Sequence, residues 1–270
     1  MSAAENDRPL RARIRDYYRT VSRYIDRERL DRTDRVFWSR LVRDSRCRTV
    51  LELGCGTGRI TRVLADAASL VVGVDLSPEM LERARRRVGD RRGVHLLRAD
   101  MRTLRLGRAF DRVLAANDPF AHLTSDADRD RAVATAARHL APGGRFVLEG
   151  HWLTPDEMRR AGRPSGLRRV RTPDGDEELR IREVWRCREE TRRCRARYEY
   201  VRDDGTVESA EFDARLWTTD ELVERLERTG LELDGLWGGF DRRPFRPGRA
   251  VRILARARRA GAPPERRRSP

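Results

Sequence analysis

Short apolar runs alternate with helical stripes through the first half of the chain. The runs cover residues 50–53, 70–74, 94–97, 110–115 and 145–150 and predict strands, and those at 50–53 and 70–74 fit strands buried in a parallel sheet. Between the runs, apolar side chains recur every three or four positions, which predicts amphipathic helices. Strands that alternate with helices in this way indicate an α/β fold built on a mostly parallel sheet.

The pattern changes after the fifth strand. A short helix gives way to residues 180–188, 194–200 and 210–216, in which apolar and polar side chains alternate. This alternation predicts three antiparallel strands with one apolar face. A capped helix and two last strands then complete the sheet, and its final strand runs antiparallel. The expected segments are a disordered stretch at 1–9, a core at 10–153 that begins with two helices, the insert at 154–217, the end of the core at 218–258 and a disordered tail at 259–270.

One stretch, from Thr49 to Asp75, predicts a nucleoside site. Its first strand breaks into glycines spaced G-x-G-x-G, and a helix and a second strand follow. Asp75 ends that second strand, 21 positions after Gly54, which is about the distance at which such units place a carboxylate on a ribose hydroxyl. Dinucleotide sites carry G-x-G-x-x-G instead, so the spacing favours a different nucleoside ligand.

The sequence around these glycines resembles the first two motifs of class I S-adenosylmethionine-dependent methyltransferases. The resemblance rests on ELGCGTG at 52–58 and GVDLSPEM at 73–80, and LLRADM at 96–101 is similar to the segment in which that family holds adenine. It implies a doubly wound, Rossmann-like, seven-stranded sheet, here with the three-stranded antiparallel sheet inserted. It also implies S-adenosylmethionine as the cofactor, which leaves as S-adenosylhomocysteine. The implied cofactor contacts are Glu52, Gly54, Cys55, Gly56, Gly58, Asp75, Leu76, Met80, Asp100, Met101 and Asn117.

The fourth strand delivers NDPFAHL, residues 117–123, to the edge where open α/β sheets bind ligands. This segment resembles glycine N-methyltransferase and, more loosely, amino-sugar N-methyltransferases. In that family an asparagine stands at the position of Asp118 and faces the substrate, and an aspartate there suits a cationic amine. A partial likeness to adenine and glutamine N-methyltransferases lacks the second proline of their motif.

Methyl transfer requires alignment of the reacting atoms more than an elaborate set of catalytic groups. An amine must nevertheless react in its neutral form, so a carboxylate or histidine that takes its proton is useful. His122, Asp118 and Tyr17 are the catalytic candidates on this ground. A purely structural histidine is the alternative for His122.

Further side chains are candidates to contact substrate, because in related methyltransferases the first helix covers the cofactor and an insert roofs the site. They are Tyr18, Tyr24, His151, Trp152, Trp185 and Tyr198, and Arg182 and Arg186 are further candidates of lower rank. The alternatives are tyrosines that only pack the helix onto the sheet, and an insert that serves as a homodimer interface or as plain cover for the core.

The amino-acid composition bears on which kinds of partner and metal site are expected. The formal charge is +16 and all 60 basic residues are arginine, which is typical of coding bias in a GC-rich genome and weakens the inference of a nucleic-acid partner. The cysteines at 47, 55, 187 and 194 lack a C-x-x-C pair, so buried thiols are expected rather than a metal site or disulfides. No run is long enough to span a bilayer and no signal peptide is recognised, so a cytoplasmic protein is expected.

We therefore predict an S-adenosylmethionine-dependent methyltransferase that acts on a small molecule, with an amine nitrogen in secondary metabolism as the leading acceptor. Transfer to oxygen or carbon is the nearest alternative, because the motifs do not fix the accepting atom. A nucleic-acid methyltransferase or basic nucleic-acid binder would bind its partner less tightly as salt rises. A cofactor-binding regulator without turnover is a third alternative.

Overall fold

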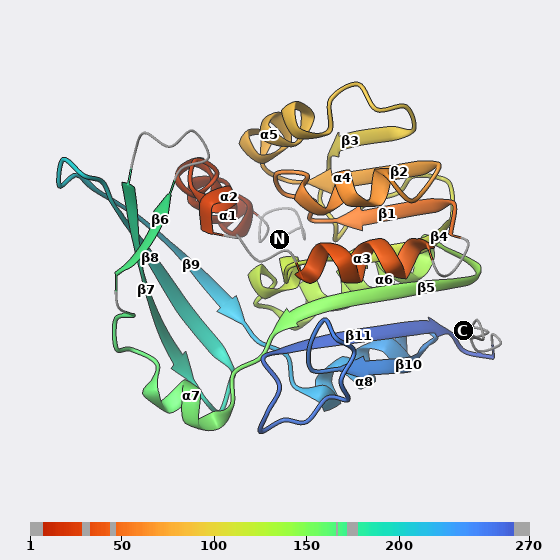
Figure 1. The fold of residues 1–270 in the computed structure, drawn as a ribbon. Helices are drawn as coiled ribbons and strands as arrows, with labels where there is room; N and C mark the ends of the chain where they lie inside the picture. The colour runs from red at the N-terminus through yellow and green to blue at the C-terminus, as the bar shows by residue number, and fades with distance from the viewer. Residues whose placement is uncertain (1–7, 29–32, 44–46, 166, 172–177, 262–270) are drawn as a thin grey trace.

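A seven-stranded sheet forms the core of the molecule, in the order β10-β11-β5-β4-β1-β2-β3 (Figure 1). The computed structural model describes residues 8–28, 33–43, 47–165, 167–171 and 178–261. Only β11 runs antiparallel to its neighbours among the described strands of this sheet, which confirms the predicted antiparallel final strand. The strands are β1 (Thr49–Leu53), β2 (Leu70–Asp75), β3 (Val94–Arg98), β4 (Phe110–Ala115), β5 (Leu140–His151), β10 (Leu231–Trp237) and β11 (Arg252–Arg259).

Helices cover both faces of this sheet, which is why the predicted strands carry continuous apolar runs. Val50 and Leu114 point to α3 and α4, whereas their neighbours Leu51 and Val113 point to α6 and α8. The predicted doubly wound α/β fold is therefore confirmed. The covering helices are α3 (Thr33–Arg43), α4 (Arg59–Ala65), α5 (Pro78–Val88), α6 (Asp126–Arg138) and α8 (Thr219–Arg228).

The N-terminal region forms three helices rather than the predicted two, because α2 (Ile25–Glu28) separates α3 from α1 (Arg8–Val21). Arg8 and Pro9 belong to α1, so the helix begins inside the stretch predicted as disordered, and residues 1–7 lie outside the described part of the chain. Apolar side chains of α1 and of the turn after it pack on the insert, which makes this helix a bridge between the insert and the core. The contacting side chains are Tyr17, Val21 and Tyr24 on one side and Leu179, Ile181 and Tyr200 on the other.

The insert is a separate antiparallel sheet of four strands, ordered β6-β7-β8-β9, where the sequence predicted three. The additional strand, β6, has the sequence RRVR, whose single apolar residue gives no alternation to detect. The sheet stands across the carboxyl ends of the parallel strands, where β9 contacts the short helix η1 (Pro119–His122) that follows β4 (Figure 1). The elements are α7 (Pro155–Arg160), β6 (Arg168–Arg171), β7 (Glu178–Arg188), β8 (Arg193–Val201) and β9 (Val207–Arg215).

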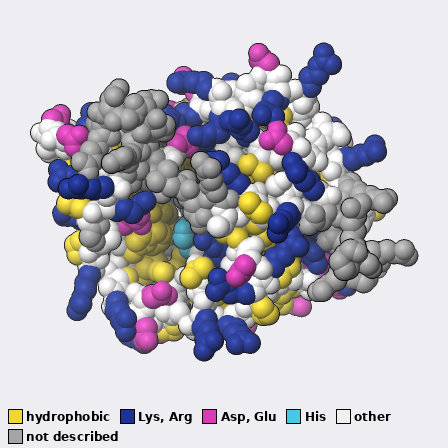
Figure 2. Space-filling model, viewed as in Figure 1, with side chains coloured by type: hydrophobic (Ala, Val, Ile, Leu, Met, Phe, Trp, Pro, Cys, Tyr) yellow, Lys and Arg dark blue, Asp and Glu magenta, His cyan; other side chains and the backbone are white. Residues whose placement is uncertain are grey.

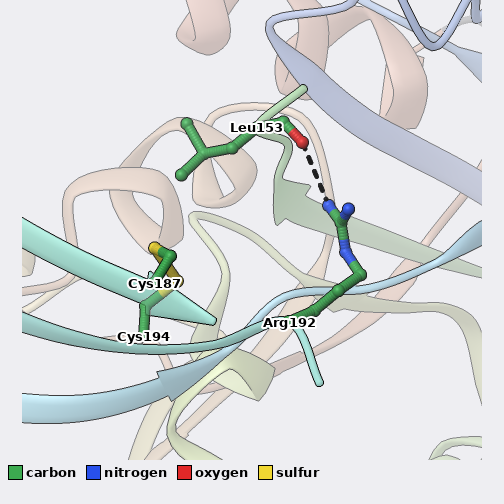
Figure 3. Close-up of a disulfide and its surroundings, with 4 residues drawn as sticks. All are labelled: Leu153, Cys187, Arg192 and Cys194. Carbon is green, nitrogen blue, oxygen red and sulfur yellow. Dashed lines mark hydrogen bonds between the residues drawn. A yellow bond between two sulfur atoms is a disulfide. The ribbon is translucent and has the colours of Figure 1, made fainter. Parts of the chain in front are cut away.

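Two of the four cysteines form a disulfide, so the prediction of four buried thiols was wrong for this pair. Cys187 on β7 and Cys194 on β8 are directly paired in the antiparallel ladder and bonded to each other (Figure 3). Their alternation placed both on the apolar face, but the register that makes them neighbours depends on a turn that the sequence did not reveal. Cys47 and Cys55 are free and buried, as predicted.

The C-terminal end of the core follows the expectation closely. Thr218 caps α8 by accepting a hydrogen bond from the backbone N–H of Glu221, and β10 and β11 pair antiparallel. β11 ends at Arg259, and the rest of the expected tail from residue 262 onward lies outside the described residues. Within the described chain, no helix combines the length and the apolar character that crossing a bilayer requires.

Candidate active site

The three glycines after β1 have left-handed backbones but different surroundings. Gly54, Gly56 and Gly58 have φ values of 72°, 54° and 72°, a region that L side chains rarely adopt. A Cβ on Gly54 would lie 2.4 Å from the Cβ of Pro119, and one on Gly58 would lie 3.0 Å from that of Ala84, whereas Gly56 faces open space. The outer glycines therefore allow close packing, and the middle one leaves room for a ligand.

Asp75 ties this turn to the start of α5. One carboxylate oxygen accepts from the backbone N–H of Gly56 at 2.8 Å, and the other accepts from that of Ser77 at 2.9 Å. Ser77 in turn caps α5 by accepting from the backbone N–H of Met80. Burial raises the pKa of Asp75, although the backbone N–H bonds oppose that shift. The carboxylate is thus fixed at the edge of the cavity described next.

A cavity of about 960 Å³ opens at the carboxyl ends of the parallel strands. Ten of the eleven predicted cofactor contacts line it, and Gly58 is the exception because it packs against α5. The cavity is also lined by side chains that the sequence reasoning missed, among them Asp26, which accepts from the Thr57 hydroxyl at 2.6 Å. Asp26 lies on the short helix α2, in a stretch of alternating charges that carries no motif. The ten predicted residues are Glu52, Gly54, Cys55, Gly56, Asp75, Leu76, Met80, Asp100, Met101 and Asn117.

The electrostatics of this cavity suit a cationic ligand. Glu52 is buried and accepts from the Thr61 hydroxyl at 2.6 Å. Burial, with a smaller contribution from nearby Asp75, raises the pKa of Glu52 to about 7, although the Thr61 hydroxyl and Arg59 oppose the shift. Burial and the same two carboxylates raise the pKa of the Cys55 thiol, which stays protonated. Carboxylates that face a cavity fit the ammonium, sulfonium and ribose hydroxyls of S-adenosylmethionine, so the residues present fit this cofactor.

Asp100 lines the cavity but already has partners. Its carboxylate accepts from the backbone and the guanidinium of Arg102, and from Arg11 at 3.0 Å. Burial would raise the pKa of Asp100, but the Arg102 bonds outweigh it and hold the pKa below its usual value. The contact between Asp100 and the adenine amine stays a prediction.

The end of β4 makes a sharp turn that the predicted catalytic residues share. Asn117 and Asp118 have φ values of 64° and 55°, in the left-handed region that Asn and Asp tolerate better than most residues. The Asn117 N–H donates to Glu149 at 2.7 Å. The buried Asp118 carboxylate accepts from the backbone N–H of His151 at 2.8 Å and from its ring Nδ1 at 2.9 Å. The turn thus joins two of the predicted residues, Asp118 and His151, across β4 and β5.

His122 lies on the other side of this turn. Its Nε2 and the Tyr18 hydroxyl are 2.7 Å apart, and the His122 ring also lies 5.8 Å from that of Tyr17. Burial lowers the pKa of His122 to about 4, although the nearby Asp118 charge opposes the shift. His122 lines both the cofactor cavity and a second cavity, which Tyr17 and Phe212 also line. Phe212 was not among the predicted site residues, although its place on the alternating face of β9 was visible in the sequence.

The predicted substrate residues divide into two groups. Tyr18 lines the cofactor cavity, and His151 and Tyr198 line a third cavity that also includes Asn117. Trp185 connects these sites, because its ring lies 6.0 Å from that of His151 and 5.7 Å from that of Phe212. Figure 2 shows a hollow beside the inserted sheet in which hydrophobic side chains surround a histidine.

Two predicted substrate contacts have other roles. Trp152 is buried in the core, where its Nε1 donates to the carbonyl of Pro247 and its ring packs edge-on against Phe245. Tyr24 stacks on Tyr200, and its hydroxyl donates to Glu208 at 2.8 Å. Neither ring lines a cavity described here, and the contacts that the structure shows for both hold the scaffold together. Substrate contact by Trp152 and Tyr24 stays a prediction.

Comparisons with known proteins agree with this geometry. A family model described as a methyltransferase domain matches residues 50–144. The chain is similar to the cypemycin N-terminal methyltransferase of a Streptomyces species, with 30% identity over 78% of this chain and 83% of that protein. It is also 39% identical to the dTDP-3-amino-3,6-dideoxy-alpha-D-glucopyranose N,N-dimethyltransferase of Streptomyces fradiae over 39% of this chain, an alignment that spans only 40% of that enzyme.

A solved structure extends the likeness to the whole fold. The SAM-bound CalS10, an amino pentose methyltransferase of Micromonospora echinaspora, superposes with a TM-score of 0.70 and 26% identity over 88% of this chain and 96% of its own. The glycine turn, the carboxylate that follows β2 and the order of the sheet therefore identify the chain as a member of the class I S-adenosylmethionine-dependent methyltransferases.

Proposed function

We propose that this enzyme methylates the nitrogen of a small-molecule amine in secondary metabolism. The observation that carries the proposal is the carboxylate of Asp118 at the end of β4. It is buried to 3% exposure, and one of its oxygens has no hydrogen-bond partner among the described residues. Asp118 lines none of the cavities described above, so it acts on a ligand through its charge rather than by contact, and a negative charge beside the cavities favours a ligand that brings positive charge.

The surroundings of Asp118 support an organic amine rather than a metal or a bare ammonium ion. The rings of Tyr17, His122, Trp185 and Phe212 form a continuous series of contacts on the insert side. Aromatic faces attract cationic amines and exclude water. Of the three similar proteins described above, one is named an N,N-dimethyltransferase of an amino sugar, one an N-terminal methyltransferase and one an amino pentose methyltransferase, and these names support an acceptor that carries an amine.

The protein's part in such a reaction is mainly to position the acceptor. The cofactor supplies an electrophilic methyl group, and the aromatic side chains hold the amine in line with it while excluding water. The Tyr18 hydroxyl is held by His122 at 2.7 Å; both residues line the cofactor cavity, and His122 also lines the second cavity. This pair orients the acceptor.

A panel of acceptors tests the proposal. The enzyme is incubated with S-adenosylmethionine labelled in its methyl group and with one of four acceptor classes: a dTDP-linked amino sugar, a peptide with a free N-terminal amine, a catechol, or total tRNA and DNA. We expect label in an amine, located on nitrogen by mass spectrometry. Label found only in the catechol or in nucleic acid would overturn the proposal.

The partner and location predictions need separate measurements. The homodimer and the cytoplasmic location stay predictions, which sedimentation velocity and cell fractionation would test. Figure 2 shows arginines scattered over the visible face rather than gathered in one patch, and many of the described ones are paired, as Arg87 is with Asp26. Much of the basic charge is therefore balanced locally, which supports a small-molecule acceptor over nucleic acid.

A further inference from the structure

Two histidines flank Asp118, and they differ in what they can do with a proton. His122, on η1, lies between the rings of Tyr17 on α1 and Phe212 on β9, whereas the His151 side chain is 49% exposed. The charges of Asp118 and His151 both act on His122, and His151 is hydrogen-bonded to Asp118. Only one of them is placed to receive a proton and pass it on.

His122 is a poor proton acceptor. Its Nε2 is hydrogen-bonded to the Tyr18 hydroxyl, and burial lowers its pKa to about 4. A base of this strength stays neutral near pH 7 and removes a proton from an amine only weakly. The sequence made His122 a catalytic candidate, but its surroundings fit it to orient Tyr18.

His151 has the opposite arrangement. Its Nδ1 lies 2.9 Å from Asp118 Oδ2, which also accepts from the His151 backbone N–H. An ionised carboxylate can only accept hydrogen bonds, so Nδ1 carries the hydrogen and Nε2 presents a lone pair. The left-handed backbone at Asn117 and Asp118 aims this carboxylate at β5, so the ring orientation is built into the turn.

His151 lines a cavity that is adjacent to the cofactor cavity. Asn117 and Arg59 line both of them, so the two cavities share a wall at the end of β4. The rings of Trp185 and Phe212 continue the same wall from His151 to His122. An acceptor held against this wall would place its nitrogen between the cofactor and His151.

We propose that His151, oriented by Asp118, accepts the proton that the acceptor amine loses when it is methylated. This inference rests on the proposed function. The nitrogen forms a bond to the methyl carbon as the carbon–sulfur bond breaks, so the sulfonium becomes the thioether of S-adenosylhomocysteine. The positive charge moves to the nitrogen, which gives one proton to Nε2 of His151. The imidazolium is balanced by Asp118, and its exposed edge returns the proton to water.

Other charged groups around His151 are mostly balanced in pairs. Three arginines face the same cavity, and each lies near a carboxylate: Arg59 near Asp34, Arg252 near Glu149, and Arg168 near Glu183 at 3.9 Å. Each of these carboxylates has an arginine partner, and Asp118 is the carboxylate that is hydrogen-bonded to the ring. The charged and titratable groups of the cavity besides His151 are Asp34, Arg59, Glu149, Arg168, Glu183, Tyr198 and Arg252.

The arrangement of the ring can be measured without any acceptor. The chain has four histidines, so a ¹⁵N-histidine spectrum is simple and His151→Gln identifies the signal of His151. We expect Nδ1 protonated and Nε2 unprotonated in the neutral ring, and we expect Asp118→Asn to change that ratio. A neutral ring with hydrogen on Nε2, or a spectrum that Asp118→Asn leaves unchanged, would overturn the proposal even if no amine substrate were found.

Kinetics with the amine that the acceptor panel identifies test the proton transfer itself. We expect His151→Ala to lower kcat by about 10- to 100-fold while the calorimetric affinity for S-adenosylmethionine stays unchanged, and we expect added imidazole to restore part of the rate. His95→Gln, an exposed histidine on β3, is the matched control and keeps full activity. An unchanged kcat in His151→Ala, or a loss that imidazole does not rescue, would contradict a role as proton acceptor.

Discussion

The cofactor half and the inserted sheet are organised by contacts of different range. Around the glycine turn, the bonds that shape the site all lie within the one strand–helix–strand segment and the start of the next helix: Gly56 with Asp75, Asp75 with Ser77, and Ser77 with Met80. The insert is held by contacts between distant segments, such as Tyr24 with Glu208. A short motif can therefore encode the cofactor site, whereas the acceptor chamber depends on how two separate sheets are placed.

The largest effect should come from breaking the glycine turn. We expect Gly54→Ala to destabilise the fold by about 4 kcal/mol in urea unfolding, because its methyl group would collide with Pro119 and the left-handed backbone is costly for alanine. Gly56→Ala is the matched control: its backbone has a similar φ but its Cβ faces open space, so about 1 kcal/mol is expected. Equal losses would show that the contact with Pro119 is unimportant.

Glu52 should give the core a measurable pH dependence. Burial raises its pKa to about 7 from 4.5, so between these values the folded state holds a proton that the unfolded chain has lost. The stability that the neutral carboxyl contributes is complete below about pH 4.5 and is lost as pH rises to about 7. We expect the unfolding free energy of the wild type, relative to Glu52→Gln, to fall by on the order of 3 kcal/mol across that range.

Urea unfolding at a series of pH values would measure this difference. Glu52→Gln is a suitable reference because glutamine stays neutral and its carbonyl can still accept from the Thr61 hydroxyl. A constant difference between the two proteins from pH 4.5 to 7 would show that Glu52 titrates normally, and the buried carboxylate would then have an ordinary pKa.

Asp75 tests the cofactor site by affinity rather than by stability. We expect Asp75→Ala to weaken S-adenosylmethionine binding by about 3 kcal/mol, or roughly 100-fold, because a charged acceptor for the ribose hydroxyls is lost. Isothermal calorimetry measures the change directly. Asp66→Ala, at the end of α4 with a half-exposed side chain, is the control and should bind normally. Unchanged affinity in Asp75→Ala would contradict the assignment of this carboxylate.

The sequence brought most of the cofactor candidates to one cavity because its information there is local. Ten of eleven predicted cofactor residues line the cavity, since strand ends, turn glycines and a helix cap each follow from neighbouring residues. It missed Asp26, which reaches the cavity from a four-residue helix that no periodicity could reveal. It did not reveal the core contacts of Trp152, because a strand end fixes the position of a residue but not the neighbours that surround its side chain.

The same limit explains the errors in the insert. Alternation identified β7, β8 and β9 and the face that each buries, but the pairing register is a relation between strands that no single strand carries. The contact between Cys187 and Cys194 is such a relation, and β6 escaped because RRVR has one apolar residue. The prediction of function had the same limit. The motifs indicated the cofactor, whereas the roles proposed for His122 and His151 differ because of their burial and hydrogen bonds, which the sequence does not give.

The disulfide offers a way to weaken the insert while leaving the cofactor site intact. Because it closes a short loop between adjacent strands, we expect its reduction to lower the unfolding free energy by about 2 kcal/mol. A Cys187→Ser, Cys194→Ser double variant should show the same loss and no further response to reductant. Cys47→Ala, which removes a free buried thiol, is the control and should still respond.

Measuring the affinity for S-adenosylmethionine before and after reduction tests whether the insert and the cofactor site are independent. The disulfide lies among Met158, Leu216 and Trp185 on the insert side, and no residue of this cluster lines the cofactor cavity. We therefore expect reduction to slow methylation of the acceptor by a few fold, through a looser aromatic wall, and to leave cofactor affinity unchanged in calorimetry. Alkylation of the denatured protein should count two thiols before reduction and four after it. If reduction lowered the cofactor affinity together with the unfolding free energy, the insert and the cofactor site would form one cooperative unit. The cofactor site would then depend on the insert even though its motif is short and local.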